Sequence, residues 1–150
     1  MNKFIRNKLT TRHYVTGVTL LELMVVVVVI GVLAAIAIPS YRQYSMRSQR
    51  VEAKSALLRL ATNQERFYLQ NNTYTNDLTA LGFDAGTSDN GVYTLAIGAA
   101  DATAFTATAT ATPGGGTNGV NQSDDVDCVS FTINAQGIRT AAPNPAGNCW

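Results

Sequence analysis

Residues 18–38 read VTLLELMVVVVVIGVLAAIAI, and this apolar stretch decides the fold of the chain. Among its 21 positions there is one charged residue, Glu22. A helix of this length is roughly 31 Å long, which matches the thickness of the hydrocarbon core of a bilayer. The stretch therefore predicts a helix that spans a membrane.

Charge divides the chain of 150 residues into blocks around that stretch. Residues 1–17 carry four basic residues and no acid, which gives a charge of +4. Residues 40–66 carry six basic residues against two acids, again +4, whereas residues 67–150 carry Arg139 against seven aspartates, which gives −6. A basic leader, an apolar segment, a basic segment and an acidic segment thus follow in order.

Three interpretations of the apolar stretch compete. Ala35-Ile36-Ala37 matches the small-x-small pattern of a secretory cleavage site, so the stretch could be a removed signal peptide. Glu22, inside the region that should be purely apolar, and the helical sequence beyond Ala37 argue against this. A plain anchor leaves Glu22 unexplained, because a carboxylate in a bilayer costs roughly 2.5–3.5 kcal/mol on insertion scales and normally has a partner. The third interpretation is an anchor that is trimmed in front of Val18.

The residues at the start of the stretch favour the trimmed anchor. Gly17-Val18-Thr19-Leu20-Leu21-Glu22 resembles the type IV prepilin motif Gly-Phe-Thr-Leu-x-Glu, and an unbroken apolar run and Pro39 follow it. The resemblance extends through Gly31, residues 34–37 and the tyrosines at 41 and 44. The family usually has phenylalanine where this chain has Val18.

The resemblance implies how the chain is processed and assembled. A prepilin peptidase at the inner membrane would cut between Gly17 and Val18, remove residues 1–17, and N-methylate the new amino terminus at Val18. Glu22, with Thr19 beside it in the motif, would meet the amine of an adjacent subunit and set the register of the fibre.

Gly31 and Pro39 are expected to weaken the helix. Proline lacks an amide hydrogen and crowds the carbonyl four residues earlier, and glycine costs roughly 1 kcal/mol against alanine in a helix interior. An ordinary membrane-helix kink is one interpretation of the pair. The family resemblance implies a second, in which this interval unwinds when subunits pack into a filament.

Residues 40–71 are predicted to continue the helix as an amphipathic segment, because neither glycine nor proline occurs between Ser40 and Leu69. Small, apolar or amide side chains recur at spacings of three or four, which predicts a packed face. These are Ala53, Leu57, Leu60, Ala61, Gln64 and Phe67. The basic side chains around this segment form either a solvated face or a surface that pairs with acidic heads of neighbouring subunits. They are Arg42, Arg47, Arg50, Lys54 and Arg59.

Residues 72–150, called the head from here on, predict a small sheet. Asn71-Asn72 ends the helix, and a loop with a helical turn closed by Gly82 follows. Alternating or β-branched runs predict four strands, at residues 92–97, 105–112, 129–133 and 138–141. The expected fold class is α+β, with the long helix of residues 18–71 packed on a four-stranded antiparallel sheet.

Cys128 and Cys149 are the only cysteines of the chain. In an oxidising compartment their separation of 21 positions predicts a disulfide worth roughly 3 kcal/mol by loop entropy, with two buried thiols as the alternative. The bond would tie residues 143–150 to the third strand. In type IV pilins such a bond encloses the carboxyl-terminal loop, and the ending Cys149-Trp150 resembles the minor pilins of the fimbrial-biogenesis group.

Several chemistries are not indicated by the residues present. His13, the only histidine, lies in the predicted leader, so the mature chain has none for acid–base catalysis or zinc. The glycines at 114–116 are followed by Thr117 and do not form a phosphate-binding loop. The aspartates at 124, 125 and 127 could offer oxygens to calcium, but the calcium-loop spacing is missing and a solvated loop is favoured. We therefore expect no enzyme, cofactor or metal site.

The function implied by the resemblance is that of a structural, minor subunit of a type IV pilus, which serves biogenesis, twitching motility or adhesion. The precursor would cross the bacterial inner membrane once with its head in the periplasm, and the processed chain would join an extracellular fibre. Its partners would be other pilins, the peptidase and methyltransferase, and the inner-membrane assembly platform. A pseudopilin of type II secretion is one alternative, which the disulfide disfavours. A DNA-binding pilin is another, which the charge of −6 on residues 67–150 disfavours.

Overall fold

The computed structural model describes residues 17–117, 119–145 and 149–150. The basic part of the predicted leader, residues 1–16, lies outside the described residues. The chain divides into two compact units, one that ends at Ile38 and one that runs from Pro39 to Trp150, here called the C-terminal unit. Each unit is described by itself.

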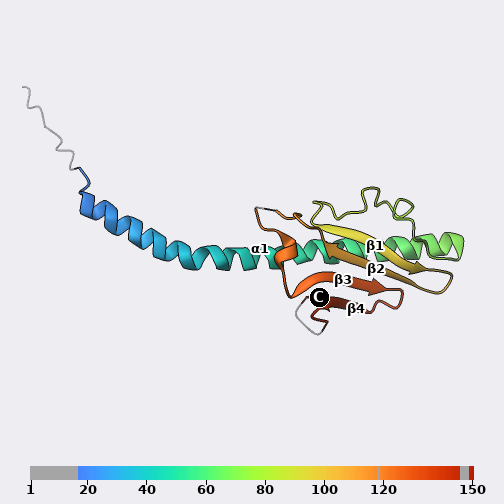
Figure 1. The fold of residues 1–150 in the computed structure, drawn as a ribbon. Coiled ribbons are helices and arrows are strands. Elements are labelled where there is room, and N and C mark those ends of the chain that lie inside the picture. Colours follow the sequence, from blue (N-terminus) through green and yellow to red (C-terminus); the bar gives the residue numbers. More distant parts are fainter. Residues whose placement is uncertain (1–16, 118, 146–148) are drawn as a thin grey trace, which may run out of the picture. The chain divides into compact units, whose positions relative to one another are not determined.

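One helix, α1, dominates the chain and runs from Leu20 to Asn71 (Figure 1). Its first part is the apolar stretch, and its rear half, residues 40–71, belongs to the C-terminal unit. Pro39 lies inside the helix. The helix ends as predicted, because Asn72 has a φ of 54°, a left-handed conformation that asparagine tolerates better than most residues.

The head contains a four-stranded antiparallel sheet, as predicted. Its strands are β1 (Tyr93–Ala100), β2 (Phe105–Ala111), β3 (Cys128–Asn134) and β4 (Arg139–Pro143). They lie in the order β1-β2-β3-β4, so each strand pairs with the one that precedes it in the chain. A short 3₁₀ helix, η1 (Gln122–Asp124), precedes β3.

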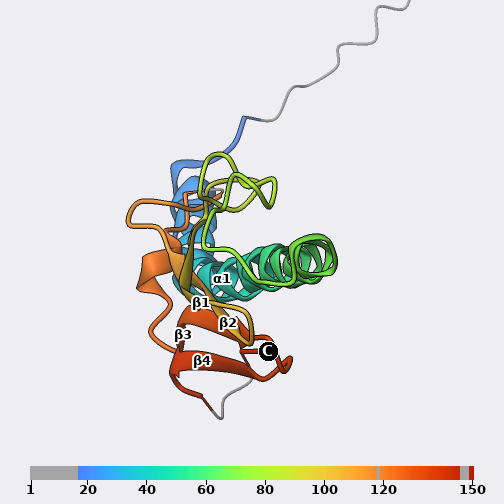
Figure 2. The same ribbon diagram turned by 90° about the vertical axis from the view of Figure 1, so that its right-hand side faces the viewer.

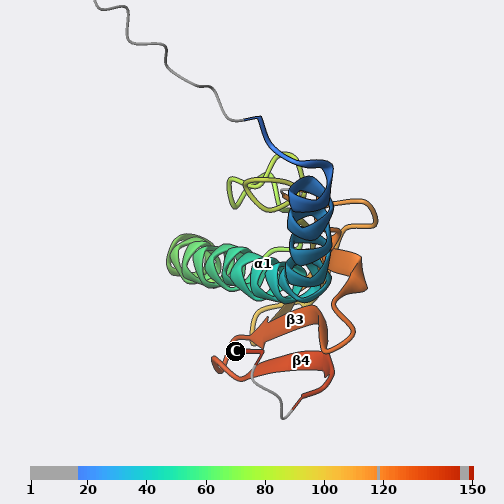
Figure 3. The ribbon, with the colours of Figure 1, turned by 90° about the vertical axis from the view of Figure 1, so that its left-hand side faces the viewer.

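The sheet packs along one side of the rear half of α1, as Figures 2 and 3 show from opposite sides. The predicted helical stripe faces it: Ala53, Leu57 and Leu60 are all fully buried. Opposite them, the inward side chains of β2 are Phe105 and three alanines, all buried. Small alanine side chains let the helix approach the sheet closely, while the aromatic rings of β1, β2 and β3 fill the remaining space. Those rings belong to Tyr93, Phe105 and Phe131.

The fourth strand begins one residue later than predicted, at Arg139, and extends to Pro143. The side chain of Asn134 explains the start. Its Oδ1 accepts hydrogen bonds from the backbone N–H groups of Gln136 and Ile138, at 3.1 and 2.9 Å. Because this bond holds Ile138 in the turn, the residue stays outside the strand and is 59% exposed.

The first strand also differs at both of its ends from the predicted range 92–97. It begins at Tyr93 and continues to Ala100, past an irregularity in pairing between Ile97 and Ala100. This irregularity breaks the alternation of inward and outward side chains. Residues 98–100, Gly-Ala-Ala, therefore carried no strand pattern that could be recognised in the sequence.

Candidate processing and assembly site

The predicted cleavage bond lies in front of α1 and outside its hydrogen-bonded turns. Gly17 has no atom within 4 Å of the place where a Cβ would be. Val18 is 71% exposed. The structure therefore places both residues of the predicted bond in an open segment that an enzyme can reach.

Thr19 and Glu22 are brought together at the first turn of the helix. The Oγ1 atom of Thr19 accepts a hydrogen bond from the backbone N–H of Glu22 at 3.2 Å, and its carbonyl accepts one from Leu23 at 3.1 Å. Thr19 is thus the residue that caps the helix. The negative charge of Glu22 in the first turn is favourable because helix amino termini carry a partial positive charge.

The capping role of Thr19 was missed in the interpretation of the sequence, although its signal was present. Threonine followed three residues later by glutamate, directly before an apolar run, is the sequence pattern of a capping box. The motif was interpreted only as a processing signal. Thr19 and Glu22 thus have a local structural role whatever else they do.

The apolar stretch has no cover within the described chain. Its most apolar window of 18 residues has a mean hydropathy of 3.0 and none of it is buried. Val25, Ile30 and Ile36 are 54%, 58% and 70% exposed. By length and composition this is one helix that could cross a membrane, and it needs lipid or other protein around it. Gly31 has no atom within 4 Å of its Cβ position, so neither interpretation of Gly31 and Pro39 is favoured.

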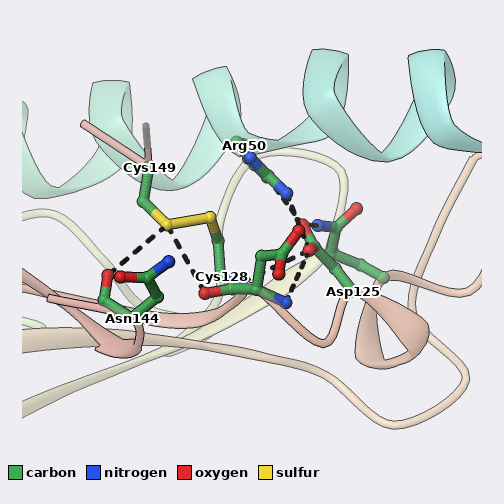
Figure 4. A network of polar contacts seen from close by, with 7 residues as sticks. Arg50, Asp125, Cys128, Asn144 and Cys149 are labelled. Carbon is green, nitrogen blue, oxygen red and sulfur yellow. Dashed lines mark hydrogen bonds and ion pairs between the residues drawn. A yellow bond between two sulfur atoms is a disulfide. The ribbon is translucent and has the colours of Figure 1, made fainter. Parts of the chain in front are cut away.

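A buried ion pair connects the rear half of α1 to the loop before β3 (Figure 4). The Nε and Nη2 atoms of Arg50 donate to the two carboxylate oxygens of Asp125, at 2.7 and 2.8 Å. The side chains are only 11% and 3% exposed. Gln122 Nε2 donates to Asp125 at 3.0 Å, and the backbone N–H groups of Asp127 and Cys128 both donate to it at 3.3 Å.

This environment shifts the titration of both partners. Burial alone would raise the pKa of the Asp125 carboxyl, but the hydrogen bonds and the charge of Arg50 outweigh burial and lower it. The hydrogen bond to Asp125 raises the pKa of Arg50 against the opposing effect of burial. Both groups are therefore charged over the whole range near neutral pH.

The basic side chains of the rear half do not form the solvated face that was favoured. Arg59 forms a two-pronged pair with Asp89, at 2.7 and 3.1 Å, on the surface. Arg42 lies 3.9 Å from Asp124. With Arg50, three of the five pair with aspartates of their own chain. Sequence periodicity places these arginines on a helix but contains no information on which distant loop residue faces them.

The expectation for the acidic loop is correct only in part. Asp124 and Asp127 are exposed, but Asp125 is buried and paired, so the loop is not uniformly solvated. Among the described residues, no three side chains of the metal-binding types converge.

Cys128 and Cys149 form the predicted disulfide, with Cα atoms 5.7 Å apart. Both cysteines are 1% exposed. The bond holds the carboxyl-terminal segment against β3, next to the Arg50–Asp125 pair (Figure 4). Trp150 closes the same region: its ring lies 5.7 Å from that of Phe131, between ring centres.

Two family models match the chain. One, described as "Type IV minor pilin ComP, DNA uptake sequence receptor", matches residues 39–133. The other, described as "Prokaryotic N-terminal methylation motif", matches residues 12–38. No curated protein matches the chain.

Two solved structures are similar. The Neisseria meningitidis non-core minor pilin PilV is 23% identical, with a TM-score of 0.52 over 71% of this chain and 94% of that one. A type IV pilin from Shewanella oneidensis is 20% identical, with a TM-score of 0.47 over 70% of this chain and 97% of that one. At this identity, the likeness to the first structure supports the fold and no more.

Proposed function

The chain belongs to the type IV minor pilin family, and we propose that its role is structural, as a fibre subunit with no catalytic step of its own. The family is one of fibre components, and the methylation motif with the apolar helix indicates a precursor held in the inner membrane before assembly. Pilus biogenesis, twitching motility and adhesion are the processes that such a subunit would serve.

The observation that carries the proposal is the contrast within α1. Its rear half is packed on a disulfide-bonded sheet, whereas its apolar first part has no cover within the described residues. Exposed apolar surface of this extent marks a membrane or protein contact. Lipid would cover it in the precursor, and the same helices of other pilins would cover it in the fibre.

We propose that prepilin peptidase cuts between Gly17 and Val18 and that the Val18 amine is then methylated. The open position of this bond in front of the helix supports the cut. Cleavage would also leave a positive amine four residues from Glu22, at the start of the apolar stretch. Recognition by the inner-membrane assembly platform would follow processing.

Glu22 is proposed to set the axial register by pairing with the Val18 amine of an adjacent subunit. Within one chain, capping by Thr19 already positions the first turn, so the carboxylate is held in a fixed orientation. In a low-dielectric setting an ion pair weakens steeply when it is misplaced, and an unpaired charge is costly. A wrongly registered subunit would therefore be rejected.

The test is competition between wild-type and Glu22→Gln chains for entry into filaments. The variant should be inserted and cleaved normally but be strongly under-represented in sheared filaments, as measured by mass spectrometry of the processed chains. Glu65→Gln, on the rear half, is the matched control and should enter normally. Equal entry of the Glu22→Gln chain would show that Glu22 only caps the helix.

DNA binding is the second candidate, because the matching family model is named for a DNA uptake sequence receptor. Phosphate binding requires a basic surface, but three arginines of the rear half are paired with aspartates. Deletion of the gene, scored for piliation, transformation and secretion, separates the candidates. Loss of transformation with intact piliation would favour DNA uptake, and loss of secretion a pseudopilin. Immunogold labelling of sheared filaments, with subunit stoichiometry, tests the structural role directly.

A further inference from the structure

Two adjoining hollows lie where the rear half of α1 begins, and together they form what we call the basal notch. One has a volume of about 90 Å³ and the other about 260 Å³. They share Gln43 and Met46 of the helix and Asp124 of the loop that follows η1. The whole notch is built from residues of the C-terminal unit.

Charges of both signs line the notch, and one pair of them is left open. Arg50 and Asp125 close on each other as described above, and Arg42 and Asp124 are 3.9 Å apart with both side chains more than half exposed. Arg47 and Asp127 line the same hollow, both exposed. Among the described residues neither of them forms an ion pair. A ligand with a negative and a positive group a few atoms apart would satisfy both.

The position of the notch in the chain indicates what that ligand is. Pro39 directly follows the apolar stretch, so along a helix Arg42 and Met46 come about 6 and 12 Å beyond Ile38. The headgroup layer of a bilayer extends about 5–8 Å beyond each face of the hydrocarbon core. Long arginine side chains reach further and place their charge among the headgroups.

The surface around the notch has the composition of a membrane interface. Tyr41 and Tyr44 are 55% and 75% exposed, and Val126 beside the notch is 76% exposed. Tyrosines are enriched at the headgroup level because they join an apolar ring to a polar hydroxyl. Nothing in the packing of the C-terminal unit requires two such rings to lie outside.

We propose that the basal notch binds the headgroup of a zwitterionic phospholipid with a primary ammonium group, of the phosphatidylethanolamine class. The phosphate would lie on Arg47, with Arg42 nearby, and the ammonium would donate hydrogen bonds to Asp127. An anionic lipid leaves Asp127 unpaired and repelled, and a trimethylated ammonium has no hydrogen to donate. The binding rests on the proposed function, because it belongs to the stage at which the subunit is held in the membrane.

The experiment uses the full chain in vesicles that contain equal amounts of phosphatidylethanolamine, phosphatidylcholine and phosphatidylglycerol. Resistance to alkaline extraction is measured first, and the lipids that stay bound after extraction in mild detergent are then measured by native mass spectrometry. Phosphatidylethanolamine should be retained about tenfold over phosphatidylcholine, the ratio that one charge-assisted hydrogen bond of about 1.4 kcal/mol gives.

The double variant Arg47→Gln, Asp127→Asn should reduce this ratio to about one. Arg59→Gln, Asp89→Asn removes the same charges from the other end of the helix and should leave the ratio unchanged. Equal retention of the two zwitterionic lipids by an inserted chain, preference for phosphatidylglycerol, or equal losses in both variants would refute the notch alone. Failure of the chain to insert would refute the membrane stage as well.

Discussion

The buried pair between Arg50 and Asp125 allows the sharpest stability prediction. Asp125→Asn keeps the shape of the side chain, but its amide nitrogen cannot accept a hydrogen bond and the negative charge is lost. Arg50 is then left 11% exposed without its partner. Breaking a buried ion pair from one side costs about 3–5 kcal/mol. We expect the lower end, about 3 kcal/mol, because the charge of Asp127 also acts on Arg50 and remains.

The assay is urea unfolding of the full chain in detergent micelles, followed by the fluorescence of Trp150, the only tryptophan. Its ring packs on Phe131 of the sheet, so its emission reports unfolding of the C-terminal unit. Asp89→Asn is the matched control. The Arg59–Asp89 pair has good geometry but side chains that are 51% and 62% exposed, so its loss should cost less than about 1 kcal/mol. Equal costs for the two variants would refute the reasoning from burial.

The same pair predicts how the difference varies with pH. The pKa of Asp125 is lower in the folded chain than in the unfolded chain, where it is about 3.9. The carboxylate therefore stabilises the fold fully above that value, and this contribution is lost as the pH falls through the folded pKa. The gap between wild type and Asp125→Asn should be constant from pH 5 to 8, within about 0.5 kcal/mol, and should shrink below about pH 4.

Three further predictions concern other parts of the chain. Gly17→Phe should leave only precursor in the membrane, because a bulky side chain replaces the small residue before the scissile bond; intact-mass analysis showing a chain that starts at Val18 would contradict this. Cys128→Ser should cost about 2–5 kcal/mol in the urea assay without affecting leader removal. Non-reducing peptide mapping of the wild type should find Cys128 joined to Cys149, and alkylatable thiols in the native protein would count against the bond. Leu57→Ala should cost about 2–5 kcal/mol because the side chain is fully buried. Leu58→Ala, one position along and 40% exposed, should cost less than about 1 kcal/mol in the same titration, and a larger effect would mean that the helix face is assigned wrongly.

The parts of the fold that were predicted correctly are those with local periodicity. The spacing of Ala53, Leu57 and Leu60 defined the buried face of α1, and the alternation of residues 105–112 defined β2, because each pattern is contained within a few turns or pleats. The disulfide was also predictable, since two cysteines allow only one pairing.

The parts that were missed depend on contacts between distant residues. Arg50 and Asp125 are 75 positions apart, and nothing in the local sequence of either distinguishes it from Arg47 or Asp127. The start of β4 depended on one asparagine side chain that bonds Ile138, a choice between turn and ladder that alternation does not encode. Thr19 was different: its capping pattern was visible, but a more specific motif occupied the same residues.

The strand order β1-β2-β3-β4 has a consequence for how the head is made. A chain that crosses a membrane from its amino terminus delivers α1 first and then the strands one by one. Because each strand pairs with the strand delivered just before it, no early strand has to wait with an open edge for a late one, which limits the time available for aggregation. Cys149 follows all four strands, so the disulfide can close only after the whole sheet has been translocated. Closure of this bond therefore marks a completely exported subunit, and chains whose export stalls earlier lack it and stay open to periplasmic proteolysis.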